Sequence, residues 1–183
     1  MIEDTSYRHG FTLVELLVVI SIITFIASVV LASVNQSRIK ARDARRISDV
    51  REIRVALELY LDVNKTYPLA SSSCVSGGAA YGLELLAPIY IRTVPRDPDG
   101  TCYKYATLTI SGPQTTYHVG ASLEDTNHQV LASSDKDCNS SAGAGNNCPV
   151  QAVYGGAGIG FNGIDSTTGC AGVTGRACYD ITP

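Results

Sequence analysis

The feature that most constrains the fold of this chain is an uninterrupted apolar segment near its N-terminus, FTLVELLVVISIITFIASVVLASV, which runs from Phe11 to Val34. Glu15 is its single ionisable side chain. At 1.5 Å per residue, about 24 residues form a helix of about 36 Å, which is long enough to cross the hydrocarbon core of a bilayer. We therefore predict three parts: a polar leader at residues 1–10, a transmembrane helix at residues 11–34 and a globular head at residues 35–183.

A secretory signal peptide is the main alternative for this segment, because Val30-Leu31-Ala32 has the small residues of a cleavage site. Three features argue against it. The apolar run is longer than the roughly 7 to 15 residues of such peptides. The leader carries Glu3 and Asp4 beside its single arginine, and Glu15 interrupts the apolar run. A helix that is retained in the mature protein is the favoured interpretation.

A carboxylate inside a membrane span is costly, so Glu15 requires a reason. One alternative is that the helix begins at the membrane surface, where the Glu15 carboxylate would reach water and need no special explanation. The neighbouring residues favour a different explanation, because Gly10-Phe11-Thr12-Leu13-Val14-Glu15 resembles the cleavage and methylation motif of type IV prepilins and pseudopilins. The resemblance implies that a prepilin peptidase cuts between Gly10 and Phe11 and methylates the new amine of Phe11. It also implies that Glu15 acts in assembly.

The motif has a physical rationale of its own. Cleavage leaves a positively charged amine on Phe11 at the start of an apolar helix, and methylation keeps that charge. Glu15 of a neighbouring subunit can pair with the amine, because opposite charges in a low dielectric are far less stable apart than together. Since only one axial offset between helices satisfies the pair, we expect Glu15 to set the register of assembly.

A second helical pattern follows the apolar segment. Apolar residues recur at spacings of three and four, which predicts an amphipathic helix with one buried face: Ile47, Val50, Ile53, Leu57 and Leu61. No glycine or proline occurs between Phe11 and Asp62, and Pro68 lies beyond the expected end. We therefore predict one continuous helix from Phe11 to about Asp62.

The region after this helix resembles the head of major pseudopilins. The resemblance rests on a Tyr67-Pro68 loop, a turn at Asp97-Pro98-Asp99-Gly100, and the strand motif Tyr103-Lys104-Tyr105. We expect strands at Cys102–Thr109, Thr115–Leu123 and about Gln129–Ala132. The predicted fold class is α+β, with a long N-terminal helix packed against a small antiparallel sheet and a disulfide-stapled C-terminal loop region.

Six cysteines occur, none of them in a C-x-x-C pair, and their even number suggests disulfides formed in an oxidising compartment. Fifteen pairings are possible. Pairing of neighbours is the one that we expect: Cys74 with Cys102, Cys138 with Cys148, and Cys170 with Cys178. Four of the six lie after Ser133, in a Gly/Ser/Asn-rich tail whose composition builds little core by itself.

One short segment of this tail carries the pattern of a calcium loop. Asp135, Asp137 and Asn139 place oxygen ligands at alternate positions. The pattern then fails, because Ser140 stands where such a loop has glycine and Asn146 where it has glutamate. Calcium is therefore an open expectation beside the alternative of a solvated turn. We expect no other cofactor.

The composition and motifs exclude several functions. A net charge of −3 and a pI near 5.5 argue against nucleic acid as a partner. His118 and His128 lack a Gly-x-Ser-x-Gly nucleophile, so we expect no enzymatic activity. The resemblance instead implies a structural subunit of a type IV pilus or pseudopilus. The alternative is a minor or tip subunit that binds DNA or a surface.

The same resemblance implies the partners and the location of the chain. Its expected partners are further copies in a homopolymeric helical filament, the prepilin peptidase and an inner-membrane assembly platform. The precursor is expected to cross the inner membrane once with its C-terminus outside, before it enters an extracellular or periplasmic filament.

Overall fold

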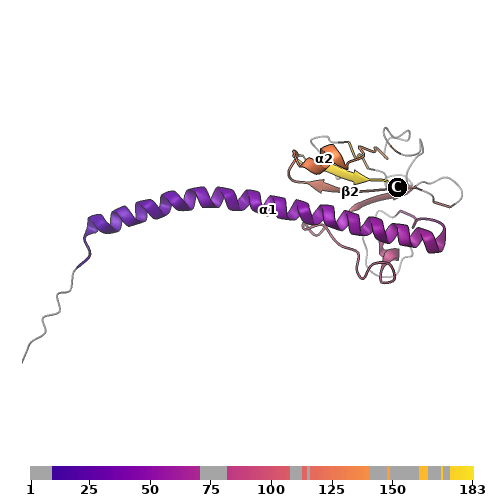
Figure 1. Cartoon of the computed structure of the whole chain (residues 1–183), viewed down its shortest axis with the longest axis horizontal. Coiled ribbons are helices and arrows are strands. Elements are labelled where there is room, and N and C mark those ends of the chain that lie inside the picture. The colour runs from indigo at the N-terminus through magenta and orange to yellow at the C-terminus, as the bar shows by residue number, and fades with distance from the viewer. Residues whose placement is uncertain are drawn as a thin grey trace, which may run out of the picture. The chain divides into compact units, whose positions relative to one another are not determined.

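A computed structural model describes residues 10–70, 82–107, 113–114, 116–140, 148, 161–164, 170 and 174–183. The chain divides into two compact units, residues 1–38 and residues 39–183. We describe the two separately and call the second unit the head. Figure 1 shows the elements in chain order.

The main helix, α1, runs without interruption from Leu13 to Asn64. The predicted helix from Phe11 to about Asp62 is therefore confirmed, with each end displaced by two residues. Residues 13–64 contain neither glycine nor proline, so no position breaks the helical hydrogen bonds. The helix stops after Asn64, because Lys65 has a left-handed φ of 57°, and the N–H of Lys65 donates to the carbonyl of Leu61.

The head contains a three-stranded antiparallel sheet in the order β1-β2-β3. Its strands are β1 (Lys104–Thr107), β2 (Tyr117–Leu123) and β3 (Ala177–Ile181). The predicted face of α1 packs into the same core as this sheet: Ile47, Val50, Ile53 and Leu57 are buried, and Leu61 is partly buried. The predicted α+β class, with a helix packed on a small antiparallel sheet, is confirmed.

The central strand β2 is buried on both of its faces. Its alternate residues Tyr117, Val119, Ala121 and Leu123 belong to the core shared with α1. The opposite face carries Gly120, where an added Cβ would lie 2.8 Å from the ring of Phe161. Described residues of the C-terminal tail, Phe161 and Cys170 among them, therefore pack on the face of the sheet that α1 does not cover. They form a small second core together with Ala106 and Cys178.

The third predicted strand, at about Gln129–Ala132, is wrong. These residues form a short helix, α2 (Gln129–Ser133), which begins where Nδ1 of His128 accepts a hydrogen bond from the N–H of Val130. The third strand is β3, close to the C-terminus, which pairs with β2. The local sequence pattern did not predict β3, because a strand is stabilised by pairing with its neighbour in the sheet. The paired residues of β2 lie more than 50 positions away in the sequence.

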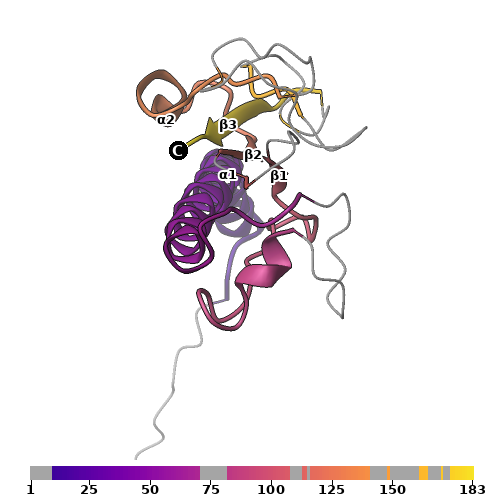
Figure 2. The ribbon, with the colours of Figure 1, turned by 90° about the vertical axis from the view of Figure 1, so that its right-hand side faces the viewer.

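Two disulfide bonds staple the tail, Cys138 to Cys148 and Cys170 to Cys178, as expected from neighbour pairing. Cys102 is also disulfide-bonded, whereas its expected partner Cys74 lies outside the described residues. A turn of 3-10 helix, η1 (Leu83–Leu86), lies on a different side of α1 from the sheet (Figure 2). The head portion of α1 is thus packed by the sheet and by the η1 segment.

Candidate functional site

The described part of the N-terminal segment begins with Gly10, which is exposed and has no neighbouring atom within 4 Å of the place that a Cβ would occupy. Thr12 caps α1, because its Oγ1 accepts a hydrogen bond of 3.2 Å from the N–H of Glu15. The same hydroxyl lies 3.5 Å from Oε2 of Glu15 and donates to it. The Thr-x-x-Glu spacing of a capping box is present in the sequence, although this cap was not among the predicted features.

Glu15 therefore lies in the first turn of α1, where a negative charge opposes the positive end of the helix dipole. This local stabilisation is one reason for a carboxylate at this position. The side chain is nonetheless exposed, and Thr12 is the one side chain among the described residues that hydrogen-bonds it. Its carboxylate is accessible to a second chain.

The apolar side chains of the first helical half have no partner within the described part of the chain. Leu13 is 87% exposed and Phe25 is 74% exposed. An 18-residue window of α1 has a mean hydropathy of 2.8 with none of it buried, so this helix is long and apolar enough to cross a membrane. Such a surface needs an apolar environment, which lipid or similar helices provide.

The few polar side chains of this half satisfy themselves within the helix. The hydroxyls of Ser21, Thr24 and Ser28 each donate to a backbone carbonyl three or four residues earlier, at 2.7–3.0 Å. Hydroxyls bonded in this way expose no unsatisfied donor to a lipid environment. Apart from Glu15, the surface of this half of α1 is therefore effectively apolar.

In the head, a buried arginine joins α1 to two distant loops. Arg46 is fully buried and holds Asp97 in a two-pronged ion pair, with N–O distances of 2.8 and 3.0 Å. Its Nη1 donates to Asp43 at 2.8 Å and to Glu124 at 2.7 Å. Asp97 opens the predicted turn, which closes where the N–H of Gly100 donates to the carbonyl of Asp97. Gly100 has a φ of 81°, which glycine adopts without strain.

The charges of this cluster stabilise one another. Hydrogen bonds from Arg42 and then Arg46, working against burial, lower the pKa of Glu124 from its ordinary value of 4.5 to about 2. Burial alone would lower the pKa of Arg46, but its hydrogen bonds to Asp97, Glu124 and Asp43 raise it overall. Removing one partner from such a cluster leaves buried charges uncompensated, so the cluster ties α1 to the turn and to the end of β2.

Arg46 was not among the residues predicted from the sequence. A signal was present, because Arg46 lies four residues before Val50 and seven before Ile53, on the face of α1 that the apolar pattern predicts to be buried. A charged residue on that face requires a buried counter-ion. Asp43, one turn earlier on the same face, was the nearest candidate.

His118 has surroundings that are typical of a structural residue. His118 lies in β2, with Nδ1 2.7 Å from Oγ of Ser140 and Nε2 2.8 Å from Oδ2 of Asp180. All three residues are at most 2% exposed, so a substrate has no access to this Ser-His-Asp array. Burial lowers the pKa of His118, although Asp180 opposes the shift.

Cys138 lies beside this array. Ligand atoms of His118, Cys138 and Asp180 lie within 4.8 Å of one another, but the sulfur of Cys138 is bonded to Cys148 and so does not act as a thiolate ligand. The array is a buried connection between β2, β3 and the stapled tail.

The residues of the expected calcium loop make separate contacts. Oδ1 of Asp135 accepts hydrogen bonds from the N–H groups of Lys136 at 3.0 Å and Asp180 at 2.7 Å. Asp137 has a left-handed backbone with a φ of 51°, and Asn139 forms a β-bridge with Asn162. A calcium ion would compete with two donors for Oδ1 of Asp135 or bind another oxygen. Calcium binding by Asp135, Asp137 and Asn139 stays a prediction.

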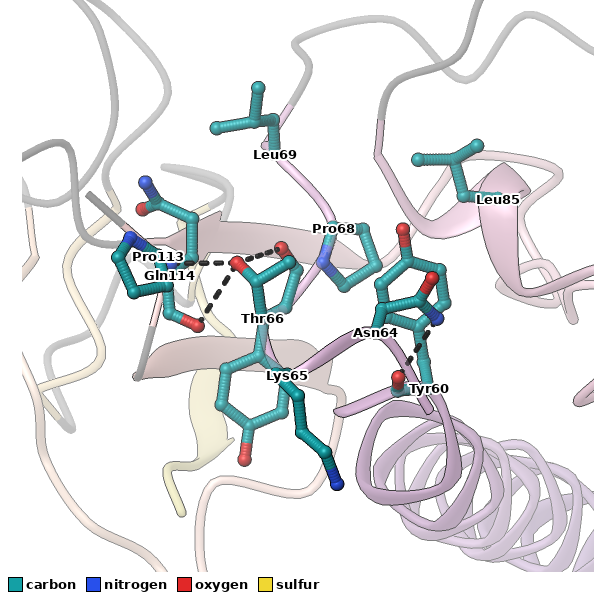
Figure 3. A pocket seen from close by; sticks show the side chains of 10 residues that line it. Tyr60, Asn64, Lys65, Thr66, Pro68, Leu69, Leu85, Pro113 and Gln114 are labelled. Atoms are coloured by element: carbon teal, nitrogen blue, oxygen red, sulfur yellow. Dashed lines mark hydrogen bonds between the residues drawn. The ribbon is translucent and has the colours of Figure 1, made fainter. Parts of the chain in front are cut away.

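A cavity of about 540 Å³ opens beside the C-terminal end of α1. Figure 3 shows its lining, which mixes tyrosine and proline rings with short polar side chains. The polar groups are bonded locally: Oγ1 of Thr66 accepts from the N–H of Gln114 at 2.7 Å, and Nδ2 of Asn64 donates to the carbonyl of Tyr60 at 2.9 Å. Its lining presents no acid–base pair, so the cavity offers no catalytic arrangement.

Comparison with known proteins places the N-terminal segment in a family. Residues 5–31 match the prokaryotic N-terminal methylation motif. The type II secretion system core protein G of Escherichia coli (strain K12) is 35% identical over 104 residues, which cover 54% of this chain and 72% of that protein. The protein of the same name from Pectobacterium carotovorum is 32% identical over 116 residues, 55% of this chain and 69% of that protein.

A third relative is matched over a larger share of its own length. The core protein G of Vibrio cholerae is 28% identical over 127 residues, which cover 62% of this chain and 81% of that protein. No solved structure matches the chain. The methylation motif, the exposed apolar helix and these relatives agree with one another. The chain therefore belongs to the type IV pilin and pseudopilin family and is a structural filament subunit.

Proposed function

We propose that the chain is the precursor of a pseudopilin that forms the homopolymeric filament of a type II secretion machine. A prepilin peptidase cleaves it between Gly10 and Phe11 and methylates Phe11, and an inner-membrane platform adds the mature subunit to the filament. Before assembly, residues 11–34 hold the precursor in the membrane and residues 35–183 lie outside. The filament role is the whole function, without enzymatic activity.

One observation carries the proposal: the first half of α1 is apolar, exposed on all sides and has its single acid in the first turn. A stable soluble helix would bury one face against its own domain. This half instead needs two successive apolar surroundings, the membrane and then the core of a filament. The similarity to core protein G supports a secretion filament in particular.

The cleavage site is tested by the N-terminus of the protein extracted from membranes. Mass spectrometry is expected to find methylated Phe11 in the native chain. A Gly10→Val precursor is expected to keep Met1, accumulate in the membrane and form no filaments, because a side chain then occupies the open space beside Gly10. Normal filaments from Gly10→Val cells would refute the cleavage assignment.

The assembly role of Glu15 is tested separately from cleavage. Glu15→Ala is expected to be processed normally but to assemble poorly, because the amine of a neighbouring Phe11 loses its partner at a cost of about 3 to 5 kcal/mol. Thr12→Ala is the matched control, since it removes the hydrogen bonds to Glu15 while keeping the carboxylate. If Glu15→Ala and Thr12→Ala reduce filament number equally, Glu15 acts through helix capping and the pairing proposal is wrong.

A further inference from the structure

Three segments of the chain carry the acceptor pattern of N-linked glycosylation, in which serine or threonine stands two residues after asparagine. They begin at Asn35, Asn64 and Asn139. An oligosaccharyltransferase must reach both the asparagine amide and the hydroxyl of such a segment, which is why used sites lie on the protein surface. The surroundings of each asparagine therefore decide which of the three segments a transferase can use.

The first segment lies inside regular helix. Asn35 and Ser37 both belong to α1, and the hydroxyl of Ser37 donates to the carbonyl of Ser33 at 3.0 Å. Two residues that are two positions apart on a helix do not face each other. A transferase could bring amide and hydroxyl together here only by unwinding α1, so we exclude Asn35.

The third segment is held by buried contacts. Asn139 is half-buried and forms a β-bridge with Asn162. On one side of it, Cys138 is buried and disulfide-bonded. On the other side, Ser140 is 2% exposed, and its hydroxyl lies 2.7 Å from Nδ1 of His118. Access to this segment would require opening the buried connection between β2, β3 and the tail, so we exclude Asn139 as well.

The second segment has the surroundings of an acceptor. Asn64 is the last residue of α1 and is exposed. The left-handed backbone of Lys65 then turns the chain out of the helix. Nδ2 of Asn64 donates to the carbonyl of Tyr60 at 2.9 Å and to the hydroxyl of Tyr90 at 3.0 Å. An N-linked sugar replaces one of the two amide hydrogens, so the other hydrogen keeps one of these bonds.

The hydroxyl of the second segment belongs to Thr66, which is half-buried. Its Oγ1 accepts a hydrogen bond of 2.7 Å from the N–H of Gln114. This is a contact between two loops at the surface, whereas the hydroxyl of Ser140 is enclosed in the core of the head. Reading Thr66 therefore disturbs less of the fold than reading the segment at Asn139.

The cavity at the end of α1 provides space for the first sugar. Asn64 lines it together with the rings of Tyr60 and Pro68 (Figure 3). Its volume of about 540 Å³ is within the range of small-molecule sites, roughly 300–1,000 Å³. Tyrosine combines a flat apolar ring, which the C–H groups of a sugar can contact, with a polar hydroxyl. The acceptor amide and a surface suited to a sugar therefore coincide.

We propose that Asn64 is the acceptor of an N-linked oligosaccharide. Nδ2 of Asn64 forms a bond to C1 of the first sugar, while C1 loses its bond to the oxygen of a polyprenyl-pyrophosphate donor. The pyrophosphate leaves with the electron pair of that bond, and the amide proton passes to a base of the transferase. The inference rests on the proposed function in one respect, because the head must lie outside the membrane, where a donor and a transferase of this class act.

The first test is mass spectrometry of the full-length protein extracted from its native cells. The peptide that contains Asn64 is expected to carry the added mass of an oligosaccharide, and Asn64→Gln is expected to lose it. Asn139→Gln is the matched control, because an acid stands two positions before either asparagine, Asp62 and Asp137. This control is expected to keep the modification. An unmodified Asn64 in the native protein, or an oligosaccharide on Asn139 instead, would overturn the proposal.

A second pair of variants separates glycosylation from any other change at Asn64. Thr66→Ser keeps the hydroxyl and is expected to stay modified. Thr66→Val keeps the shape of the side chain without the hydroxyl, and its modified fraction is expected to fall at least about tenfold, because the hydroxyl is part of the acceptor pattern. A modification of Asn64 that persists unchanged in Thr66→Val would contradict the proposed acceptor.

The same samples distinguish this inference from the proposed function. Filaments built of subunits with methylated Phe11 and unmodified Asn64 would refute glycosylation and leave the filament role standing. A chain that is glycosylated at Asn64 but forms no filament would support the modification and refute the filament role.

Discussion

Arg46 shows how a single side chain decides where a helix attaches to a domain. It replaces the water that a guanidinium normally binds with carboxylates from α1, from the Asp97 turn and from the residue after β2. The carboxylate of Asp43 in turn accepts the backbone N–H groups of Glu124 and Asp125, at 2.8–3.1 Å. The cluster fixes positions as much as it adds stability, because each charge is satisfied in one arrangement only.

Replacing Arg46 is expected to destabilise the head strongly. Arg46→Met leaves Asp97, Asp43 and Glu124 without their shared cation, and such a loss costs about 3 to 5 kcal/mol. We call the fragment from residue 35 onward, which contains the whole head, the soluble head, and its urea denaturation measures this cost. Arg45→Met is the control: its side chain is 62% exposed and its pair with Asp49 spans 3.7 Å, so its loss is expected to cost at most about 1 kcal/mol. Equal losses for the two variants would contradict the role given to Arg46.

His118 is expected to make the head less stable in mild acid. Its pKa is lowered in the folded state, so below the ordinary value of 6.5 the unfolded chain binds a proton that the folded chain does not. Stability contributed by neutral His118 is therefore complete above about pH 6.5 and falls below it, by at most about 1.4 kcal/mol per pH unit. Denaturation of the soluble head at pH 7.5, 6.5 and 5.5 measures the slope. His118→Gln is expected to lack this component, and an unchanged slope in that variant would assign the effect to another group.

Among the elements, β3 is a strand whose structure depends on its pairing with β2. Its residues Tyr179 and Ile181 complete the core shared with α1, while Cys178 and Asp180 face the stapled tail. The strand therefore contributes to both sides of the sheet. Gly163 approaches it so closely that an added Cβ would lie 2.7 Å from Cγ of Asp180, which leaves room for glycine alone.

A matched pair of isoleucine truncations tests the contribution of β3. Ile181→Ala removes buried methyl groups from a strand at the end of the chain and is expected to cost about 2 to 5 kcal/mol of unfolding free energy. Ile89→Ala makes the same chemical change at a site that is 80% exposed and is expected to alter stability by less than about 0.5 kcal/mol. The comparison uses urea denaturation of the soluble head, and a small loss at Ile181 would mean that β3 is not part of the stable core.

At the scale of the whole molecule, the first half of α1 has no packing partner among the residues that the structure describes, whereas the head is held together in several ways. The sheet and η1 pack on α1, the Arg46 cluster fixes one end, and disulfides staple the tail. We therefore expect the head to keep its structure if the first half of α1 passes from a membrane into a filament.

Calcium binding would stabilise the tail further, and the melting midpoint of the soluble head tests for it. If Asp135, Asp137 and Asn139 bind calcium, millimolar calcium is expected to raise the melting midpoint relative to chelator, because an ion that binds the folded state alone stabilises it. Asp135→Asn and Asn139→Ala are expected to reduce this shift. An unchanged midpoint in the native head would contradict the calcium prediction. The tail would then be stabilised by its disulfides, by the contacts of His118 and by packing.

The sequence by itself determined the features that depend on local pattern. An apolar run of membrane length, the Gly10-Phe11 motif with Glu15, and the buried face that contains Val50 and Ile53 all follow from spacing along the chain. Neighbouring cysteines likewise indicated the two disulfides that staple the tail. Helical periodicity and composition act over a few residues, so one sequence displays them directly.

Only the tertiary structure decided the features that join distant segments. The pairing of β3 with β2, the ion pairs that join Arg42 and Arg46 to Asp97 and Glu124, and the contacts of His118 with Ser140 and Asp180 unite residues from 22 to 82 positions apart. No local propensity marks such partners, because each gains its energy only when the other is already in place. Gln129–Ser133 likewise could not be assigned from its local pattern alone. In the structure β3, rather than this segment, pairs with β2, and Gln129–Ser133 forms a helix that His128 caps.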